Sequence, residues 1–93
     1  MEYVRTVFTG HAIRRMFERK ISKPEVLETL AYGEVIADYP DDVPFPSYLM
    51  LHFIGGRPIH IVAAMDSDSK TAYIVTAYDP EPAIWDDNFK KRR

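Results

Sequence analysis

The chain has 93 residues, 46% of them hydrophobic and 13% aromatic, which predicts one small folded domain rather than a disordered tail. It contains no cysteine, which excludes a disulfide framework, a thiolate nucleophile and a thiolate zinc site. Its net charge of −2 argues against broad, non-specific nucleic-acid binding, and no apolar run reaches membrane-spanning length, so we expect a soluble cytoplasmic protein with no membrane partner.

Charge is distributed unevenly along the chain. Residues 1–23 contain six Lys/Arg and two acidic residues, residues 24–89 contain two Lys/Arg and twelve acidic residues, and Lys90 to Arg93 are all basic. Exposed charges more than about 8 Å apart are largely screened at physiological salt. A local cluster of cations therefore attracts phosphate more strongly than the net charge indicates.

The first predicted helix follows a short alternating segment at residues 3–8, which is either a first strand or a lead-in. Thr9 is a suitable N-cap, and we expect the helix to run to about Lys20. Its apolar stripe consists of Ala12, Ile13, Met16 and Phe17. Its polar half carries His11, Arg14, Arg15, Glu18 and Arg19. Folding alone does not require so many cations around one imidazole, whereas a site that grips a phosphate and moves a proton does.

The second predicted helix begins with a capping box at Ser22 to Glu25, which has a proline in its first turn. Its buried stripe consists of Val26, Leu27, Leu30 and Ala31. Gly33 suits a left-handed C-terminal stop. We expect the two helices to form a hairpin joined around Ile21.

The apolar pattern changes to that of strands from Glu34 onward. A short strand at 35–37 is followed by a loop with three prolines, a hairpin with a two-glycine turn at 55–56 and a last strand at 71–78. We expect an α+β fold in which an N-terminal helical hairpin packs on an antiparallel sheet of about four strands.

The expected strand register gathers three polar side chains on one face. The two-glycine turn places Leu51 opposite His60, and a five-residue loop at 66–70 would place His60 opposite Thr76. Tyr78 would lie on the same face, so this polar end of an apolar face is the expected mouth of a cleft.

These residue types fit metal-free RNA cleavage, which needs no cofactor. A base removes the proton of the ribose 2′-hydroxyl, cations stabilise the charge on the attacked phosphate, and an acid protonates the leaving 5′-oxygen. His11, in the first turn of a cationic helix, is expected to be neutral and able to accept a proton. The candidate catalytic residues are His11, Arg15, Arg19, His60 and Tyr78. The candidate substrate-binding residues are Arg14 and Thr76.

Structural explanations compete with these roles. His60 is equally well explained as a core histidine that Thr76 and Tyr78 satisfy. The charged side of the first helix is also typical of a solvated face, which would make the protein a non-catalytic protein- or RNA-binding module. A metal site built from His11, His52 and His60 lacks ligand spacing, so we expect no metal.

Several motifs resemble those of a bacterial and archaeal domain-of-unknown-function family (DUF4258-like) placed among the RelE/ParE-like toxins. The matching motifs are His11-Ala12-x-x-Arg15-Met16-x-Glu18-Arg19-x-Ile21-Ser22, Leu30-x-x-Gly33-Glu34, Tyr39-Pro40-Asp41-Asp42, Pro46-Ser47-Tyr48-Leu49, Arg57-Pro58-x-His60-x-Val62 and Thr76-x-Tyr78-x-Pro80. The resemblance covers about residues 8–80, leaving 81–93 as the C-terminal tail of a single RelE-like domain over 1–93.

The resemblance implies helices packed on an antiparallel sheet and metal-independent mRNA cleavage. It carries roles over to the matching residues His11, Arg15, Arg19, His60 and Tyr78. It also implies a partner antitoxin that has a small zinc finger or a helix-turn-helix. We therefore predict the endoribonuclease toxin of a type II toxin–antitoxin pair.

Overall fold

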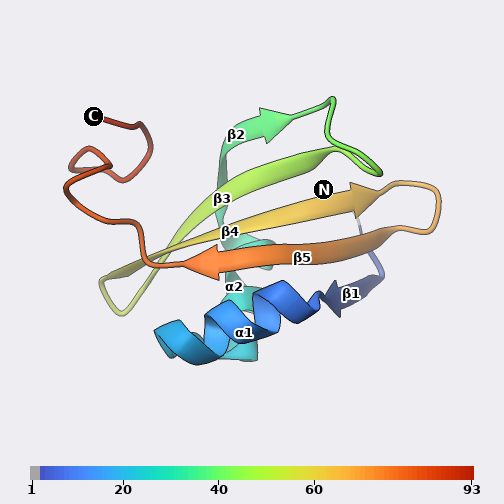
Figure 1. Ribbon diagram of the computed structural model, residues 1–93, viewed down its shortest axis with the longest axis horizontal. Helices are drawn as coiled ribbons and strands as arrows, with labels where there is room; N and C mark the ends of the chain where they lie inside the picture. The colour runs from blue at the N-terminus through green and yellow to red at the C-terminus, as the bar shows by residue number, and fades with distance from the viewer. Residues whose placement is uncertain (1–2) are drawn as a thin grey trace.

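The computed structural model describes residues 3–93, in which two helices and five strands follow one another as β1, α1, α2, β2, β3, β4 and β5 (Figure 1). Their bounds are β1 Arg5–Phe8, α1 Gly10–Arg19, α2 Lys23–Tyr32, β2 Glu34–Tyr39, β3 Ser47–Ile54, β4 Arg57–Asp66 and β5 Thr71–Tyr78. The described strands form one sheet in the order β1-β5-β4-β3-β2. Neither helix described here is long and apolar enough to cross a membrane.

The sheet is mixed, so the expected antiparallel sheet of about four strands is wrong. β1 pairs in parallel with β5, with Arg5 opposite Thr71 and Phe8 opposite Ile74, while the other neighbouring strands are antiparallel. β1 is only four residues long, and its partner lies near the other end of the sequence. A local alternation pattern contains no information about such a distant partner, which is why the parallel pairing was not predicted.

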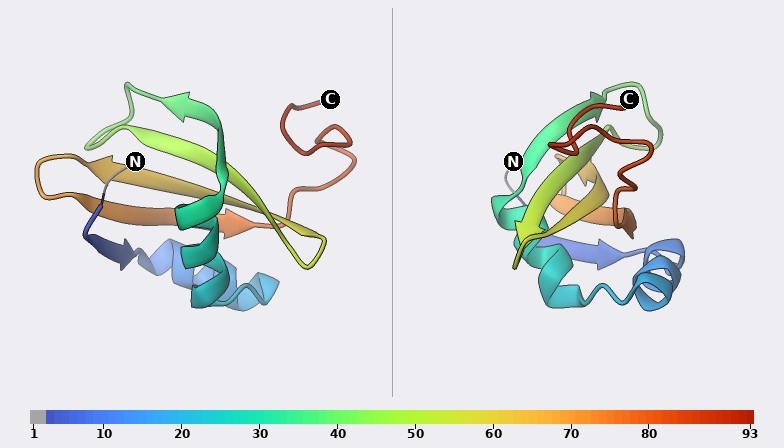
Figure 2. Two further views of the ribbon diagram at one scale, coloured as in Figure 1. Left: turned by 180° about the vertical axis from the view of Figure 1, so that it is seen from behind. Right: turned by 90° about the vertical axis from the view of Figure 1, so that its left-hand side faces the viewer.

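Both helices cover the same face of the sheet but pack on different strands (Figure 2). α1 lies against β5, whereas α2 lies against β3 and β4. The expected hairpin of mutually packed helices is therefore wrong, because each helix makes its main contacts with the sheet. Thr9 explains the position of α1: its hydroxyl caps the helix by accepting from the Ala12 N–H (3.1 Å) and donates to the Ile74 carbonyl of β5 (2.9 Å).

α2 has the predicted capping box. The Ser22 hydroxyl accepts from the Glu25 N–H at 3.2 Å, and the Glu25 carboxylate accepts from the Ser22 N–H at 2.8 Å. The predicted left-handed stop at Gly33 is wrong, because Gly33 is extended with φ −71°. A Cβ at Gly33 would instead collide with the carbonyl oxygen of Thr29 and lie 3.0 Å from that of Leu51. Glycine is needed here because α2 ends directly against β3.

The main hydrophobic core lies between the helices and the sheet. Its buried members are Ala12, Met16, Ile21, Val26, Leu30, Met50, Ile59, Ile61, Ala63, Met65, Ala72, Ile74 and Ala77. α1 contributes only Ala12 and Met16, whereas Ile13 and Phe17 are 49% and 86% exposed. The apolar stripe of α1 is thus wider than the face that the helix buries.

The C-terminal segment, residues 79–93, covers part of the opposite face of the sheet, so the helices and this segment lie on different sides (Figure 2). Trp85 from this segment is buried against His60 of β4, with ring centroids 4.6 Å apart. At the other end of the same face, Phe45 stacks on Tyr73 with ring centroids 5.6 Å apart. The last residues of the chain therefore pack as part of the folded body.

Candidate functional site

The candidate residues of α1 all lie on its exposed side. His11, Arg15 and Arg19 are spaced by four residues, so they form a row along the helix, with Arg14 beside it. Arg15 lies 3.6 Å from Glu18, and both side chains are about half exposed. We call His11, Arg14, Arg15 and Arg19 the basic face. This face presents its imidazole and guanidinium groups to solvent rather than to a cleft.

The C-terminal end of α1 is held by Arg57, for which no role was predicted. Its guanidinium donates to the carbonyl oxygens of Arg19 (2.9 Å) and Lys20 (3.2 Å) and to both carboxylate oxygens of Asp79 (2.7 and 3.1 Å). The hydrogen bond to Asp79 raises the pKa of Arg57. Arg57 thus joins the start of β4 and the end of β5 to α1, which fixes the position of the basic face. The signal for this role was a cation directly after a two-glycine turn.

His60, Thr76 and Tyr78 share one face of the sheet, as the register predicted, but by a different pairing. The loop between β4 and β5 is one residue shorter than expected, and a bulge follows where Val62 lies opposite Thr76. The shorter loop and the bulge each shift the register by one residue in the same direction, so His60 lies opposite Tyr78 instead of Thr76. A total shift of two residues leaves all three polar side chains on the same face.

His60 is completely buried, and both of its ring nitrogens have partners. Nε2 lies 2.8 Å from the backbone carbonyl oxygen of Phe89, which can only accept, so Nε2 carries the proton. Nδ1 therefore accepts from the Tyr78 hydroxyl at 3.2 Å. Burial lowers the pKa of His60 and raises the pKa of Tyr78, which keeps both side chains neutral. His60 joins the C-terminal segment to β4, and no substrate reaches its ring in this arrangement.

The structure does not bring the two candidate histidines together. His60 faces the C-terminal segment, whereas His11 is exposed on α1, which covers the other side of the sheet. The expected common, cation-lined cleft is therefore not formed, and Thr76 and Tyr78 lie with His60, away from the arginines of α1. Strand alternation predicts which residues share a face, but it does not predict which face the helices cover.

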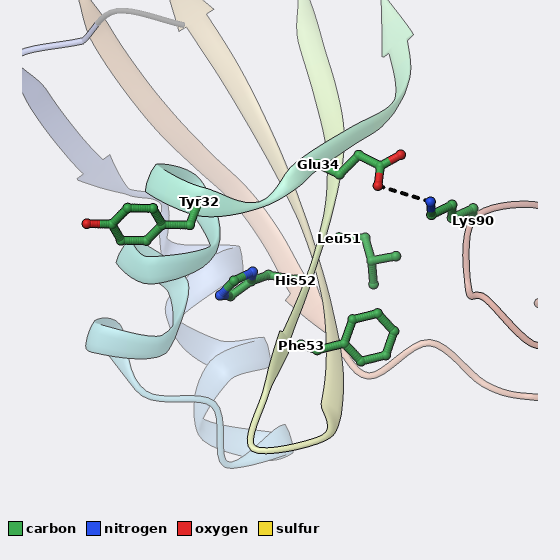
Figure 3. A pocket seen from close by; sticks show the side chains of 6 residues that line it. All are labelled: Tyr32, Glu34, Leu51, His52, Phe53 and Lys90. Carbon is green, nitrogen blue, oxygen red and sulfur yellow. Dashed lines mark ion pairs between the residues drawn. The ribbon is translucent and has the colours of Figure 1, made fainter.

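A hollow at the outer edge of β3 lies where the pairing of β2 with β3 ends (Figure 3). Its lining residues are Tyr32, Glu34, Leu51, His52, Phe53 and Lys90. Its polar groups already have partners, because Lys90 lies 3.1 Å from Glu34 and His52 Nε2 lies 2.8 Å from Glu28. Figure 3 shows Leu51 and Phe53 pointing to one side of the strand and His52 to the other. The polar groups of this hollow do not converge on one point, so the basic face is the better candidate.

Among residues 3–93, no three His, Cys, Asp or Glu side chains are grouped so that they could hold a metal ion. No curated protein and no solved structure matches the chain. A model of the family described as "Domain of unknown function (DUF4258)" matches residues 8–79. This match does not assign the family to the RelE/ParE-like toxins, so membership of that superfamily stays a prediction. Because the matched residues make up most of the chain, the protein belongs to the DUF4258 family.

Proposed function

We propose that this protein is a cytoplasmic RNA-binding module that contacts RNA through the basic face of α1. The observation that carries the proposal is the exposed row of His11, Arg15 and Arg19 on a helix held at both ends, by Thr9 and by Arg57. A held helix presents its cations in a fixed arrangement, which lowers the entropy cost of binding.

Guanidinium groups suit a phosphate ligand for two reasons. They stay charged at any working pH, and they donate two parallel hydrogen bonds to one phosphate. Four residues of helix rise by about 6 Å, so successive members of the row are separate contact points along an extended strand. Residues 24–89, with twelve acidic residues against two Lys/Arg, would repel RNA. Of the basic residues at the C-terminal end, Lys90 is paired with Glu34 and Arg93 with Asp87, which favours the basic face of α1 as the contact surface.

Fluorescence anisotropy with a labelled single-stranded RNA, measured over a series of salt concentrations, tests the proposal. The Arg14→Ala/Arg15→Ala variant is expected to bind more weakly and to reduce the slope of log K against log salt by about 0.7 for each phosphate that is no longer neutralised. The matched control is Arg5→Ala/Lys91→Ala, which removes the same charge from exposed positions outside α1. Equal weakening by the control, or no RNA binding by the wild type at low salt, would refute the proposal.

His11 supports a second candidate, the metal-independent endoribonuclease toxin predicted from the sequence. Its imidazole is exposed one turn from Arg15, so it could take the 2′-hydroxyl proton while Arg15 and Arg19 hold the phosphate. The 2′-oxygen then forms a bond to phosphorus as the bond to the 5′-oxygen breaks, and the 5′-oxygen takes its proton from water. In this candidate His11 works without His60, and an antitoxin with a zinc finger or helix-turn-helix would be the partner. RNA cleavage in chelator and growth arrest on expression, both abolished in a folded His11→Ala variant, would support it. Cleavage that persists in this variant would contradict it.

A further inference from the structure

A second hollow lies at the C-terminal end of α1, next to the basic face. It has a volume of about 490 Å³ and is lined by Met16, Phe17, Lys20, Ile21 and Ser22. Phe17 forms its most prominent wall, because this side chain is 86% exposed. Full burial of a phenylalanine side chain contributes about 1.5–3 kcal/mol to stability, so the folded protein gains little from Phe17 where it stands. A ligand that covers the ring would recover this free energy.

The backbone around the hollow is held in one conformation. Lys20 is left-handed with φ 56°, and this turn brings the Ile21 N–H to the carbonyl oxygen of Met16 at 2.9 Å. Ile21 is 4% exposed and belongs to the main core, so the hollow has a packed floor. Ser22 is fixed by its capping box with the start of α2. The hollow is therefore formed before any ligand binds.

Cations lie on both sides of the exposed ring. Arg14 precedes Phe17 by three residues of α1, so the two are surface neighbours on the helix, and Lys20, the left-handed residue that ends α1, lines the hollow together with Phe17. Ile13, four residues before Phe17, extends the apolar surface and is 49% exposed. An apolar segment of another protein would have to cover both cations, which favours a ligand that combines a flat apolar group with negative charges. An unpaired nucleotide has both.

We propose that this hollow is a base-binding subsite for single-stranded RNA, in which an unpaired base stacks on Phe17 while Arg14 and Lys20 contact the flanking phosphates. The proposal rests on RNA binding by the basic face and specifies which form of RNA is bound. Every base has a π-face, so stacking tolerates different sequences. In a duplex the bases are stacked on one another and their faces are not available, so duplex RNA cannot use the subsite.

The test compares single-stranded RNA with a duplex of the same sequence in the anisotropy assay. Phe17→Ala is expected to lower affinity for the single strand about 5- to 150-fold, as the removal of base–aromatic stacking does, and to leave the salt slope unchanged because every phosphate-binding cation remains. Phe17→Tyr keeps an aromatic ring at this position and is expected to bind the single strand as the wild type does. Tyr32→Ala is the matched control, because Tyr32 is an aromatic side chain on α2 that is 77% exposed. The wild type is expected to prefer the single strand, and Phe17→Ala is expected to abolish that preference.

The outcomes separate the subsite from the proposed function. If the wild type binds RNA and its affinity is unchanged by Phe17→Ala, the subsite is overturned while RNA binding stands. If the wild type binds no RNA, both fall. If sedimentation shows self-association that Phe17→Ala abolishes, the hollow is an interface between copies of the chain and the subsite is overturned.

Discussion

His60→Ala is expected to destabilise the protein by about 2–5 kcal/mol. The substitution removes hydrogen bonds to Tyr78 and Phe89, each contributing about 0.5–1.5 kcal/mol. It also removes a fully buried ring from its edge contact with Trp85 and leaves a cavity. We expect this cavity to cost a further ~1–2 kcal/mol, at the low end for core cavities, because the C-terminal segment can partly collapse into it. Small domains have total stabilities of about 5–15 kcal/mol, so this decrease is a large share.

The assay for His60→Ala combines urea unfolding with tryptophan fluorescence. Trp85 is the only tryptophan of the chain and is 6% exposed, so its emission should shift to longer wavelength when the C-terminal segment leaves β4. His52→Ala is the control, since its pair with Glu28 is partly exposed and a surface pair contributes about 0–1 kcal/mol. Unchanged stability and emission in His60→Ala would show that His60 does not hold the segment.

The same buried histidine predicts how stability depends on pH. Burial lowers the pKa of His60 below its ordinary 6.5, so the unfolded chain binds this proton more readily than the folded protein. The contribution of neutral His60 is fully present above about pH 6.5 and is lost as the pH falls through the lowered folded-state pKa. His60→Gln should therefore lose less stability than the wild type between neutral and mildly acidic pH. His11 and His52 are present in both proteins and do not affect the comparison.

Three further predictions concern single interactions, each measured by urea or thermal unfolding. Arg57→Met is expected to lower the free energy of unfolding by about 1–3 kcal/mol. Arg57→Lys should restore little of this stability, because an ammonium group cannot make the forked bond to Asp79 and also reach the end of α1. Full recovery of stability with lysine would contradict this reasoning. Gly33→Ala should lower the free energy of unfolding by about 2 kcal/mol or more, because the added Cβ collides with the α2 backbone. The control is Gly10→Ala, which has no atom within 4 Å of its added Cβ and should be neutral or stabilising. Equal effects of the two substitutions would refute the steric reason. Ser22→Ala should cost about 0.5–2 kcal/mol because it removes an N-cap, and an unchanged midpoint would argue against the capping box.

The elements of this fold that depend on near neighbours in sequence could be predicted. The Ser22 capping box and the β3–β4 register both rest on interactions within a few residues of a turn, and both occur as predicted. The parallel pairing of β1 with β5 and the packing of the C-terminal segment join distant parts of the chain. Periodicity contains no distance information of this kind, which is why neither the partner strand of β1 nor the contacts of the C-terminal segment could be specified from the sequence.

The division of the candidate site follows from the same difference. The Arg57-Pro58-x-His60 motif now has a structural explanation at both ends, because Arg57 holds α1 and His60 holds the C-terminal segment. Thr76 and Tyr78 lie on the same face of the sheet as His60. The side chains of His11, Arg15 and Arg19 are exposed on α1. The Arg15–Glu18 pair is a surface pair that contributes at most about 1 kcal/mol to stability. Since stability does not require these α1 side chains, substitutions there should separate function from folding. Substitutions at His60 would change both at once, and a loss of activity there would say nothing about chemistry.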